Sequence, residues 1–486
     1  MKETMLQFFQ WYTRADGFQY TRLRRLAPKL GRLGYTMVWL PPAYKGAGGK
    51  KDNGYAPYDL YDIGEFNQKG TVRTKYGTAK QYKAAIDACH KASIQVIADI
   101  VFNHRMGGDE EEVVLVRNVD PQNRTTFIST PYATKIYTRF LFANRKGKYS
   151  SLLWDASFFK ATDRNLKNQY QIMLFEGKKW DEKVSKEQGN FDYIMGLDVD
   201  TLDPKVKEAL DTWGIWYTNR FDLDGYRLDA IKSIDATFFT SWLATMHAQT
   251  TAGPFSVGEY WSASLEDLKR YLADCNYCMR LFDVPLHYNL HNASRSSGNY
   301  DVRTLFNGTL SQAMPDYAVA FVDNHDTQPT QALESWVMDW FKTSAYALIL
   351  LGECQVPCVF LGDLHGISKT KNPPVPLLDE MVWIRNHLLE GPYANLCDDD
   401  PQKCCWMMLG AHPVLVLFTI GGPKTRTIRF PQYAGCSFVD ITRSDQEVHL
   451  DEKGIGTFDC LGGCCSIYLL PQDVARMKKA LSYWWF

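Results

Sequence analysis

The chain has 486 residues, of which 45% are hydrophobic and 22% charged, and its formal net charge is −1. These values are typical of a globular protein, and the balanced charge excludes a general attraction to nucleic acid or to an anionic membrane surface. Length alone allows about three domains, although a single large barrel can absorb much of such a chain.

No apolar stretch approaches the length of a membrane span, the longest being residues 345–351. A strand-like segment at residues 5–9 follows Met1 almost directly, without the basic and apolar regions of a signal peptide. We therefore expect a cytoplasmic protein that acts as a monomer and has no membrane partner. Twelve cysteines in such a chain are expected to be reduced thiols. No zinc site is predicted, because Cys275 and Cys278 lack a second pair at a matching distance.

Strand and helix patterns alternate over the first hundred residues and again after residue 204. The predicted strands are residues 5–9, 36–40, 95–101, 225–228, 255–257, 279–283, 318–322 and 358–361. The predicted helices are residues 20–33, 79–92, 204–220, 236–249, 265–273, 302–310, 331–351 and 377–389. The strands are continuous and apolar, as in a parallel sheet that is covered on both faces. Eight strand–helix units predict the α/β fold of a (β/α)8 TIM barrel.

Two further parts interrupt or follow this alternation. About one hundred residues separate the third strand from its helix, which is too long for a loop and indicates an inserted domain. After about residue 393, short strands at 405–409, 414–419, 425–430, 437–441 and 466–470 predict an all-β module. We therefore divide the chain into a barrel of residues 1–103 and 204–393, an inserted domain of residues 104–203 and a C-terminal β-sandwich of residues 394–486.

Charged residues stand at the ends of four predicted barrel strands. The segments are Asp99-Ile-Val-Phe-Asn-His104, Arg227-Leu-Asp229, Gly258-Glu259-Tyr-Trp261 and Phe321-Val-Asp-Asn-His-Asp326. Barrel enzymes carry their catalytic groups where strands end and the following loops begin. Arg227 and Asp229 alone could form a structural ion pair. Four carboxylate-bearing strand ends on one rim are costly unless they have a function, so the sequence predicts an active site there.

These four segments resemble, in the same order, the four signature regions of the α-amylase family, glycoside hydrolase family 13. The likeness extends to the loop Asn53-Gly-Tyr-Ala-Pro-Tyr-Asp-Leu-Tyr-Asp62 and to Gly189-Asn-Phe-Asp-Tyr193, and it covers essentially the whole chain. The bacterial liquefying enzymes and their cytoplasmic relatives are the most similar members. The resemblance implies that the barrel, the insertion and the β module are that family's domains A, B and C.

The resemblance implies a role for each of three acids: Asp229 as the nucleophile, Glu259 as the general acid/base and Asp326 as the stabiliser of the distorted sugar. Retaining glycoside hydrolysis needs two carboxyls about 5–5.5 Å apart, one ionised and one protonated. Arg227 projects from the same strand face as Asp229 and is expected to keep that carboxyl ionised. A poorly solvated site beside a carboxylate is expected to raise the pKa of Glu259.

The resemblance also implies a set of substrate-binding residues, which are Arg227, His104, His325, Tyr55, Asp99, Lys232 and Trp261. The two histidines would donate hydrogen bonds at subsite −1, where Tyr55 would be a stacking platform. Lys232 and Trp261 would line the aglycone side. For Tyr55 and Trp261, simple loop packing is the alternative.

A calcium site between domains A and B is implied as well. Calcium prefers hard oxygen ligands. One aspartate of the multi-metal cluster of the liquefying enzymes is replaced near Phe158, which argues against a second calcium. Acidic loop residues without any metal are the alternative. The implied ligands are Asn103, Asp192, Asp198 and the carbonyl of Ser233, with Asp181 and Asp200 at further acidic positions of the cluster.

The resemblance implies a retaining, endo-acting α-amylase that cleaves internal α-1,4-glucosidic bonds of starch, glycogen or maltodextrins through a covalent glycosyl-Asp229 intermediate. A maltodextrin glucanotransferase or an exo-acting maltooligosaccharide hydrolase is the alternative on the same scaffold. A non-catalytic glucan-binding barrel would be expected to lack one of the three acids. Ser233 departs from the family, which usually has histidine there, so a side-chain contact to the product-side sugar would be lost.

Overall fold

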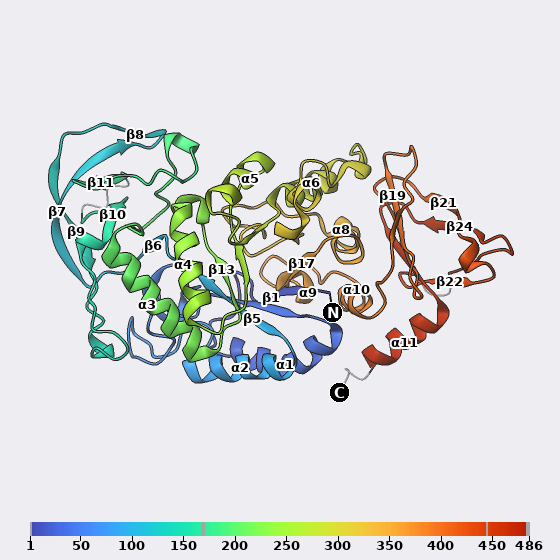
Figure 1. The fold of residues 1–486 in the computed structure, drawn as a ribbon, viewed down its shortest axis with the longest axis horizontal. Helices are drawn as coiled ribbons and strands as arrows, with labels where there is room; N and C mark the ends of the chain where they lie inside the picture. Colours follow the sequence, from blue (N-terminus) through green and yellow to red (C-terminus); the bar gives the residue numbers. More distant parts are fainter. Residues whose placement is uncertain (1, 167–170, 444–445, 483–486) are drawn as a thin grey trace.

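Eight parallel strands close into a barrel at the centre of the computed structural model, which describes residues 2–166, 171–443 and 446–482 (Figure 1). In chain order the barrel strands are β1 (Met5–Gln7), β2 (Met37–Leu40), β5 (Gln95–Ile100), β13 (Gly225–Leu228), β14 (Phe255–Gly258), β15 (Arg280–Phe282), β16 (Ala318–Phe321) and β17 (Val356–Phe360). Strand β17 pairs with β1 and completes the closure. The predicted (β/α)8 barrel is therefore confirmed.

The barrel strands are buried on both faces. Residues such as Trp39, Ile97 and Phe321 fill the interior of the barrel, whereas Val38, Ala98 and Ala320 belong to the core under the helices. The surrounding helices are α1 (Gln19–Leu33), α2 (Ala79–Lys91), α3 (Pro204–Phe221), α4 (Ala236–Gln249), α5 (Leu265–Asp274), α6 (Val284–Arg295), α8 (Asp339–Leu351) and α10 (Leu378–His387). This double burial explains why the strands read as continuous apolar runs rather than alternating ones.

The prediction is wrong after the sixth strand. The helix that follows β15 is α6, whereas most of the predicted helix 302–310 is not helical; a 3-10 turn at Val302–Thr304 precedes the short helix α7 (Leu310–Ala313). Asp283 caps α6 by accepting a hydrogen bond from the Leu286 amide, so the residue that was assigned to the strand starts the helix instead. Helix α8 begins at Asp339, because the Val337 amide donates to Asp323 rather than to a helical carbonyl.

A sheet of seven strands occupies the insertion after β5 and lies at one end of the molecule (Figure 1). Its strands are β6 (His104–Arg105), β7 (Glu110–Asp120), β8 (Asn123–Phe127), β9 (Tyr132–Arg139), β10 (Phe159–Thr162), β11 (Met173–Phe175) and β12 (Leu197–Val199). The pairing of β12 with β6 sets Asp198 opposite His104. The inserted sheet is thereby joined to the strand end that carries part of the predicted site.

The C-terminal part is all β apart from one final helix, and it lies at the other end of the molecule (Figure 1). Its strands are β18 (Tyr393–Asn395), β19 (Lys403–Met408), β20 (Val414–Thr419), β21 (Lys424–Arg429), β22 (Ser437–Asp440), β23 (Glu447–His449), β24 (Ile455–Cys460) and β25 (Cys465–Leu469), followed by α11 (Pro471–Ser482). A six-stranded sheet and the β21–β24 pair enclose a separate apolar core that includes Phe438 and Phe458. The predicted all-β module is therefore present.

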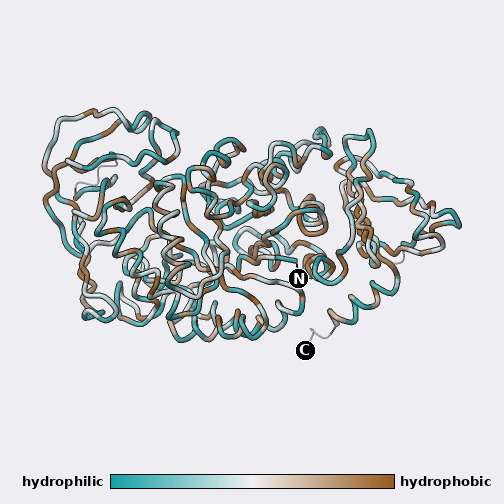
Figure 2. The backbone as a smooth tube through the Cα atoms, in the orientation of Figure 1, coloured by the Kyte–Doolittle hydropathy of each residue, from teal (hydrophilic) through white to brown (hydrophobic). Residues whose placement is uncertain are grey.

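Hydrophobic residues are spread along the whole backbone, and most of the buried ones belong to one large apolar core. Figure 2 shows hydrophilic residues interspersed with hydrophobic ones along each part of the backbone. Within the described ranges, no helix has the length and apolar character that a membrane crossing requires. All twelve cysteines lie in the described part of the chain, and none of them is paired in a disulfide there.

Candidate active site

The four charged strand ends meet on one rim of the barrel. Parallel pairing sets Arg227 of β13 beside Asp99 of β5, and it sets Leu228 beside Gly258 at the end of β14. Asp229 and Glu259 follow these last two residues directly, and the Glu259 amide donates to the carbonyl of Leu228. The register of the sheet therefore brings together residues that are up to 160 positions apart in the sequence.

Arg227 is the centre of this rim. It is fully buried, and its Nη1 lies 2.8 Å from Oδ1 of Asp99 and 2.5 Å from Oδ1 of Asp229. Its Nη2 lies 2.7 Å from Oε2 of Glu259. A single guanidinium thus binds three carboxylates at once, which fixes the two candidate catalytic acids relative to each other.

Burial dominates the protonation of these acids. It raises the pKa of Asp229 to about 6, although Arg227 acts in the opposite direction. The prediction that Arg227 keeps Asp229 ionised is therefore too simple, because loss of water outweighs the guanidinium, yet a pKa of about 6 still leaves this carboxyl mainly ionised at neutral pH. The pKa of Glu259 is raised by burial and by the nearby charge of Asp229, as predicted. Burial, together with the charge of Glu259, also raises the pKa of Asp326.

The residue after the candidate nucleophile has an unusual backbone. Ala230 adopts φ +49°, a left-handed conformation that costs a non-glycine residue about 1 kcal/mol or more. In this conformation its amide lies 3.2 Å from Oε2 of Glu259 and donates to it. The turn therefore supplies a second hydrogen bond to the acid that faces Asp229.

His325 and Asp326 lie against an aromatic wall. Gln7 Nε2 donates to Nδ1 of His325 at 3.0 Å, and burial lowers the pKa of that histidine well below its usual value. The neutral ring therefore carries its proton on Nε2, which lies 3.4 Å from Oδ2 of Asp326. The ring of Tyr55 stacks on His325 with centroids 5.0 Å apart, and Trp11 stacks on Tyr55 at 6.1 Å.

Tyr55 and His104 are linked to each other. The Tyr55 hydroxyl donates to Asp99 at 2.7 Å, and its carbonyl oxygen lies 2.8 Å from Nε2 of His104. The other ring nitrogen of His104 lies 3.3 Å from Oδ1 of Asn103. Both nitrogens of His104 thus have protein partners, so a sugar hydroxyl would have to compete with the Tyr55 carbonyl for this donor.

Lys232 and Trp261 are neighbours, as expected for two residues on one side of a cleft. Nζ of Lys232 donates to the Trp261 carbonyl at 3.2 Å and to both carboxylate oxygens of Glu187 at 3.1 Å. The Trp261 indole donates to the hydroxyl of Tyr288 at 3.1 Å. This hydrogen bond from the ring nitrogen fixes the orientation of the Trp261 indole.

Sequence reasoning missed three residues of this rim: Gln7, Trp11 and Glu187. Gln7 is fully buried, and it stands alone as a polar residue in an apolar strand. Because a buried amide needs a partner, this isolated glutamine was a usable signal. Trp11 follows the end of β1, where the strand-end rule that found the acids applies equally. No pattern in the sequence marks Glu187, which lies in the insertion.

The predicted metal ligands gather where the inserted sheet meets the barrel. The Asn103 side-chain amide lies 3.1 Å from the carbonyl oxygen of Ser233 and 3.3 Å from that of Asp192. Asp198 is buried, and neither of its carboxylate oxygens has a hydrogen-bond partner among the described residues. Across residues 2–166, 171–443 and 446–482, no three His, Cys, Asp or Glu side chains are placed to hold a metal together.

Two lysines form ion pairs with the remaining predicted metal ligands, Asp181 and Asp200. Nζ of Lys160 lies 2.8 Å from Oδ2 of Asp181, and Nζ of Lys178 lies 2.8 Å from Oδ2 of Asp200. Near Phe158, where the sequence analysis expects an aspartate of the cluster to be replaced, Lys160 is the residue whose side chain contacts these ligands. Asp181 and Asp200 are ion-paired with lysines rather than open to a metal ion.

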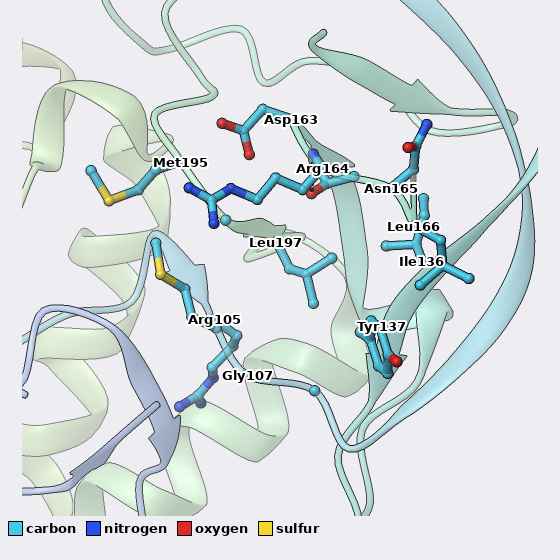
Figure 3. A pocket seen from close by; sticks show the side chains of 14 residues that line it. Arg105, Gly107, Ile136, Tyr137, Asp163, Arg164, Asn165, Leu166, Met195 and Leu197 are labelled. Carbon is cyan, nitrogen blue, oxygen red and sulfur yellow. Dashed lines mark hydrogen bonds between the residues drawn. The ribbon is translucent and has the colours of Figure 1, made fainter. Parts of the chain in front are cut away.

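A separate hollow of about 650 Å3 lies in the inserted sheet (Figure 3). Arg105, Ile136 and Leu197 are among its lining residues, whereas Asp229 and Glu259 are not. This hollow is therefore distinct from the rim that carries the acids.

A barrel of eight strands, an inserted sheet after the third strand and buried carboxyls around one arginine define the class of this protein as a (β/α)8-barrel glycoside hydrolase. The family model for the alpha amylase catalytic domain matches residues 28–404. The chain belongs to the α-amylase family.

Individual relatives extend this match along the chain. The chain is 42% identical to an alpha-amylase of Geobacillus stearothermophilus, over 96% of this chain and 86% of that protein. It is 38% identical to the cytoplasmic alpha-amylase of Escherichia coli strain K12, over 97% of this chain and 99% of that protein. The crystal structure of alpha-amylase I from Eisenia fetida shares the fold with a TM-score of 0.65 at 15% identity, covering 96% of each chain.

Proposed function

We propose that this chain is an endo-acting α-amylase that hydrolyses internal α-1,4-glucosidic bonds of starch, glycogen or maltodextrins with retention of configuration. The observation that carries the proposal is the pair of acids on one guanidinium: Asp229 on Nη1 of Arg227 and Glu259 on Nη2. Two carboxyls held close together, with one ionised and one protonated, are the requirement of the retaining reaction. Relatives named alpha-amylase at about 40% identity over nearly the whole chain support this activity.

In the proposed mechanism Asp229 attacks the anomeric carbon while Glu259 donates its proton to the glycosidic oxygen. The bond to the leaving chain breaks, and a glycosyl ester forms on Asp229. Glu259, now ionised, takes a proton from water, the hydroxide attacks the anomeric carbon, and the ester bond to Asp229 breaks. Asp326 is proposed to bind sugar hydroxyls more tightly in the transition state than in the ground state. Tyr55 and Trp261 are proposed to contact the sugars on either side.

We further propose one structural calcium ion at the joint between the barrel and the inserted sheet, held by Asn103, Asp192, Asp198 and the Ser233 carbonyl. The observation that fits a cation is the buried carboxylate of Asp198, which accepts no hydrogen bond from the described residues and lies 3.9 Å from the Lys160 ammonium. Two carbonyl oxygens already face the Asn103 amide, and rotating that amide by 180° presents its oxygen to the same point. These are the hard oxygen ligands that calcium prefers, and the ion would tie the two parts together.

The cytoplasm is the proposed compartment, supported by the relative named for it and by twelve free thiols.

The pH dependence of the reaction follows from Asp229. Because its pKa is raised to about 6, protonation below that pH removes the nucleophile. We expect kcat/KM to fall about tenfold per pH unit below pH 6 and to be nearly flat just above it. Initial rates on a short maltooligosaccharide between pH 4 and 8 would measure this fall of kcat/KM on the acid side. If kcat/KM began to fall only near pH 4, the range of an ordinary aspartate, burial would not be what sets the pKa of Asp229.

Digestion of amylose tests the proposed function. An endo-acting enzyme is expected to abolish the iodine stain while few reducing ends have formed, and the new ends are expected to have the α configuration by NMR. Slow loss of stain with a single short product would instead indicate an exo-acting hydrolase, like the relative named glucan 1,4-alpha-maltohexaosidase. Longer chains formed from a pure maltodextrin would indicate a glucanotransferase. Repeating the digestion with a chelator tests whether calcium supports the active form.

A further inference from the structure

Lys160 is an almost completely buried lysine among aspartates. It lies on β10, and its side chain is 2% exposed. The pairing of β10 with β12 shifts register between Phe159 and Ala161, so Lys160 is the extra residue of a β-bulge. Bulges re-aim a side chain, and this one directs the ammonium toward the joint with the barrel rather than along the regular alternation of the strand.

The ammonium of Lys160 binds three carboxylates. Its Nζ lies 2.8 Å from Asp181, 2.7 Å from Asp192 and 3.9 Å from Asp198, measured to Oδ2 in each case. All three aspartates are buried, so their carboxylates need a cation beside them. By its position, the Lys160 ammonium is the cation of this cluster.

The same position is where a metal ion would have to lie to bind the three aspartates together. A calcium ion needs its oxygens at 2.3–2.6 Å, and an ammonium already lies within hydrogen-bond distance of two of them. The four predicted metal carboxylates face two ammoniums, those of Lys160 and Lys178, which leaves two negative charges. One divalent ion balances that remainder, whereas a second would give an excess of positive charge in a buried site.

We propose that the Lys160 ammonium is a built-in cation that takes the place of a second metal ion at this joint, so that the chain binds no more than one calcium there. The carboxylates of Asp181, Asp192 and Asp198 are then held by the chain itself at any calcium concentration. The inference uses the proposed function only for the identity of the single ion.

Calcium titration by isothermal calorimetry and by thermal unfolding, on chelator-treated full-length protein, tests the inference. The wild type is expected to bind at most one calcium per chain. Lys160→Asp removes the ammonium and adds a ligand, so it is expected to bind one calcium more than the wild type. Its Tm in 1 mM CaCl2 is expected to rise by about 3 °C more than that of the wild type, for binding at about a hundred times Kd.

Lys178→Met is the matched control, because Lys178 pairs with Asp200 at the partly exposed edge of the same cluster. It is expected to keep the calcium content and calcium response of the wild type. An equal gain in both variants, or a wild type that binds two calcium ions, would overturn the inference. If Lys160→Asp does not fold, Lys160→Met replaces it. A Lys160→Met protein with the Tm and calcium response of the wild type would reject the lysine as a structural cation. A wild type without any bound calcium would refute the proposed calcium ion but leave the comparison with Lys160→Asp intact.

Discussion

Replacing Asp229 by Asn is expected to lower kcat on amylose by at least about 10^4-fold, the scale of loss seen when a nucleophile is removed. An amide oxygen is too weak a nucleophile to form the glycosyl ester. The fold is expected to survive, because Arg227 keeps Asp99 and Glu259 as partners. Rates by a reducing-end assay and Tm by calorimetry, measured on the same preparation, check both parts.

Asp224→Asn provides the control for this variant. Asp224 precedes the same strand at its opposite end, where it pairs with His90 at 2.8 Å. The same chemical change is therefore made about one strand length away from the rim, and it is expected to leave kcat within about a factor of two. If Asp229→Asn kept more than about 1% of the wild-type rate, Asp229 would not be the nucleophile.

Replacing Glu259 by Gln is expected to reduce kcat on amylose by about 10^3-fold or more, because the sugar leaving group then departs without a proton. The loss is expected to be much smaller on an α-glucosyl fluoride or a dinitrophenyl glycoside, whose leaving groups do not need protonation. This dependence on the leaving group separates the acid/base role from a general loss of structure. Parallel rates on the three substrates measure it.

Glu266→Gln is the control for Glu259→Gln. Glu266 lies on α5, the helix after β14, and its side chain is 79% exposed. Its variant is expected to behave as the wild type on all three substrates. An equal loss of rate on all substrates in Glu259→Gln would argue against the acid/base role and would point to disruption of the ion pair with Arg227.

Most of the barrel was predictable, because each strand is a short apolar run between turn signals. The prediction failed around Asp283 and again before Asp339. In both places aspartate side chains capture backbone amides, those of Leu286 and Val337, and thereby decide where a helix begins or a loop remains. Such captures depend on which residues the fold brings near, so local propensity cannot reveal them.

The three acids were predictable because Asp229 and Glu259 directly follow barrel strands, and Asp326 lies in the loop that begins where β16 ends. The rule that strand ends carry the chemistry needs only the position of each strand in the sequence. The same rule also predicts a site residue near Trp11. It does not predict Glu187, which contacts Lys232 only after the insertion has folded back over the barrel.

The amino-acid sequence alone thus determined the kind of fold, the family and the set of carboxyls on the rim. Two properties required the folded chain. The pKa of Asp229 depends on how much water all surrounding groups exclude, and burial there outweighs the neighbouring Arg227. The role of Lys160 depends on aspartates 21, 32 and 38 positions away, which a β-bulge and the joint with the barrel bring to one ammonium. Desolvation and long-range pairing are sums over neighbours in space, and the order of residues along the chain does not contain them.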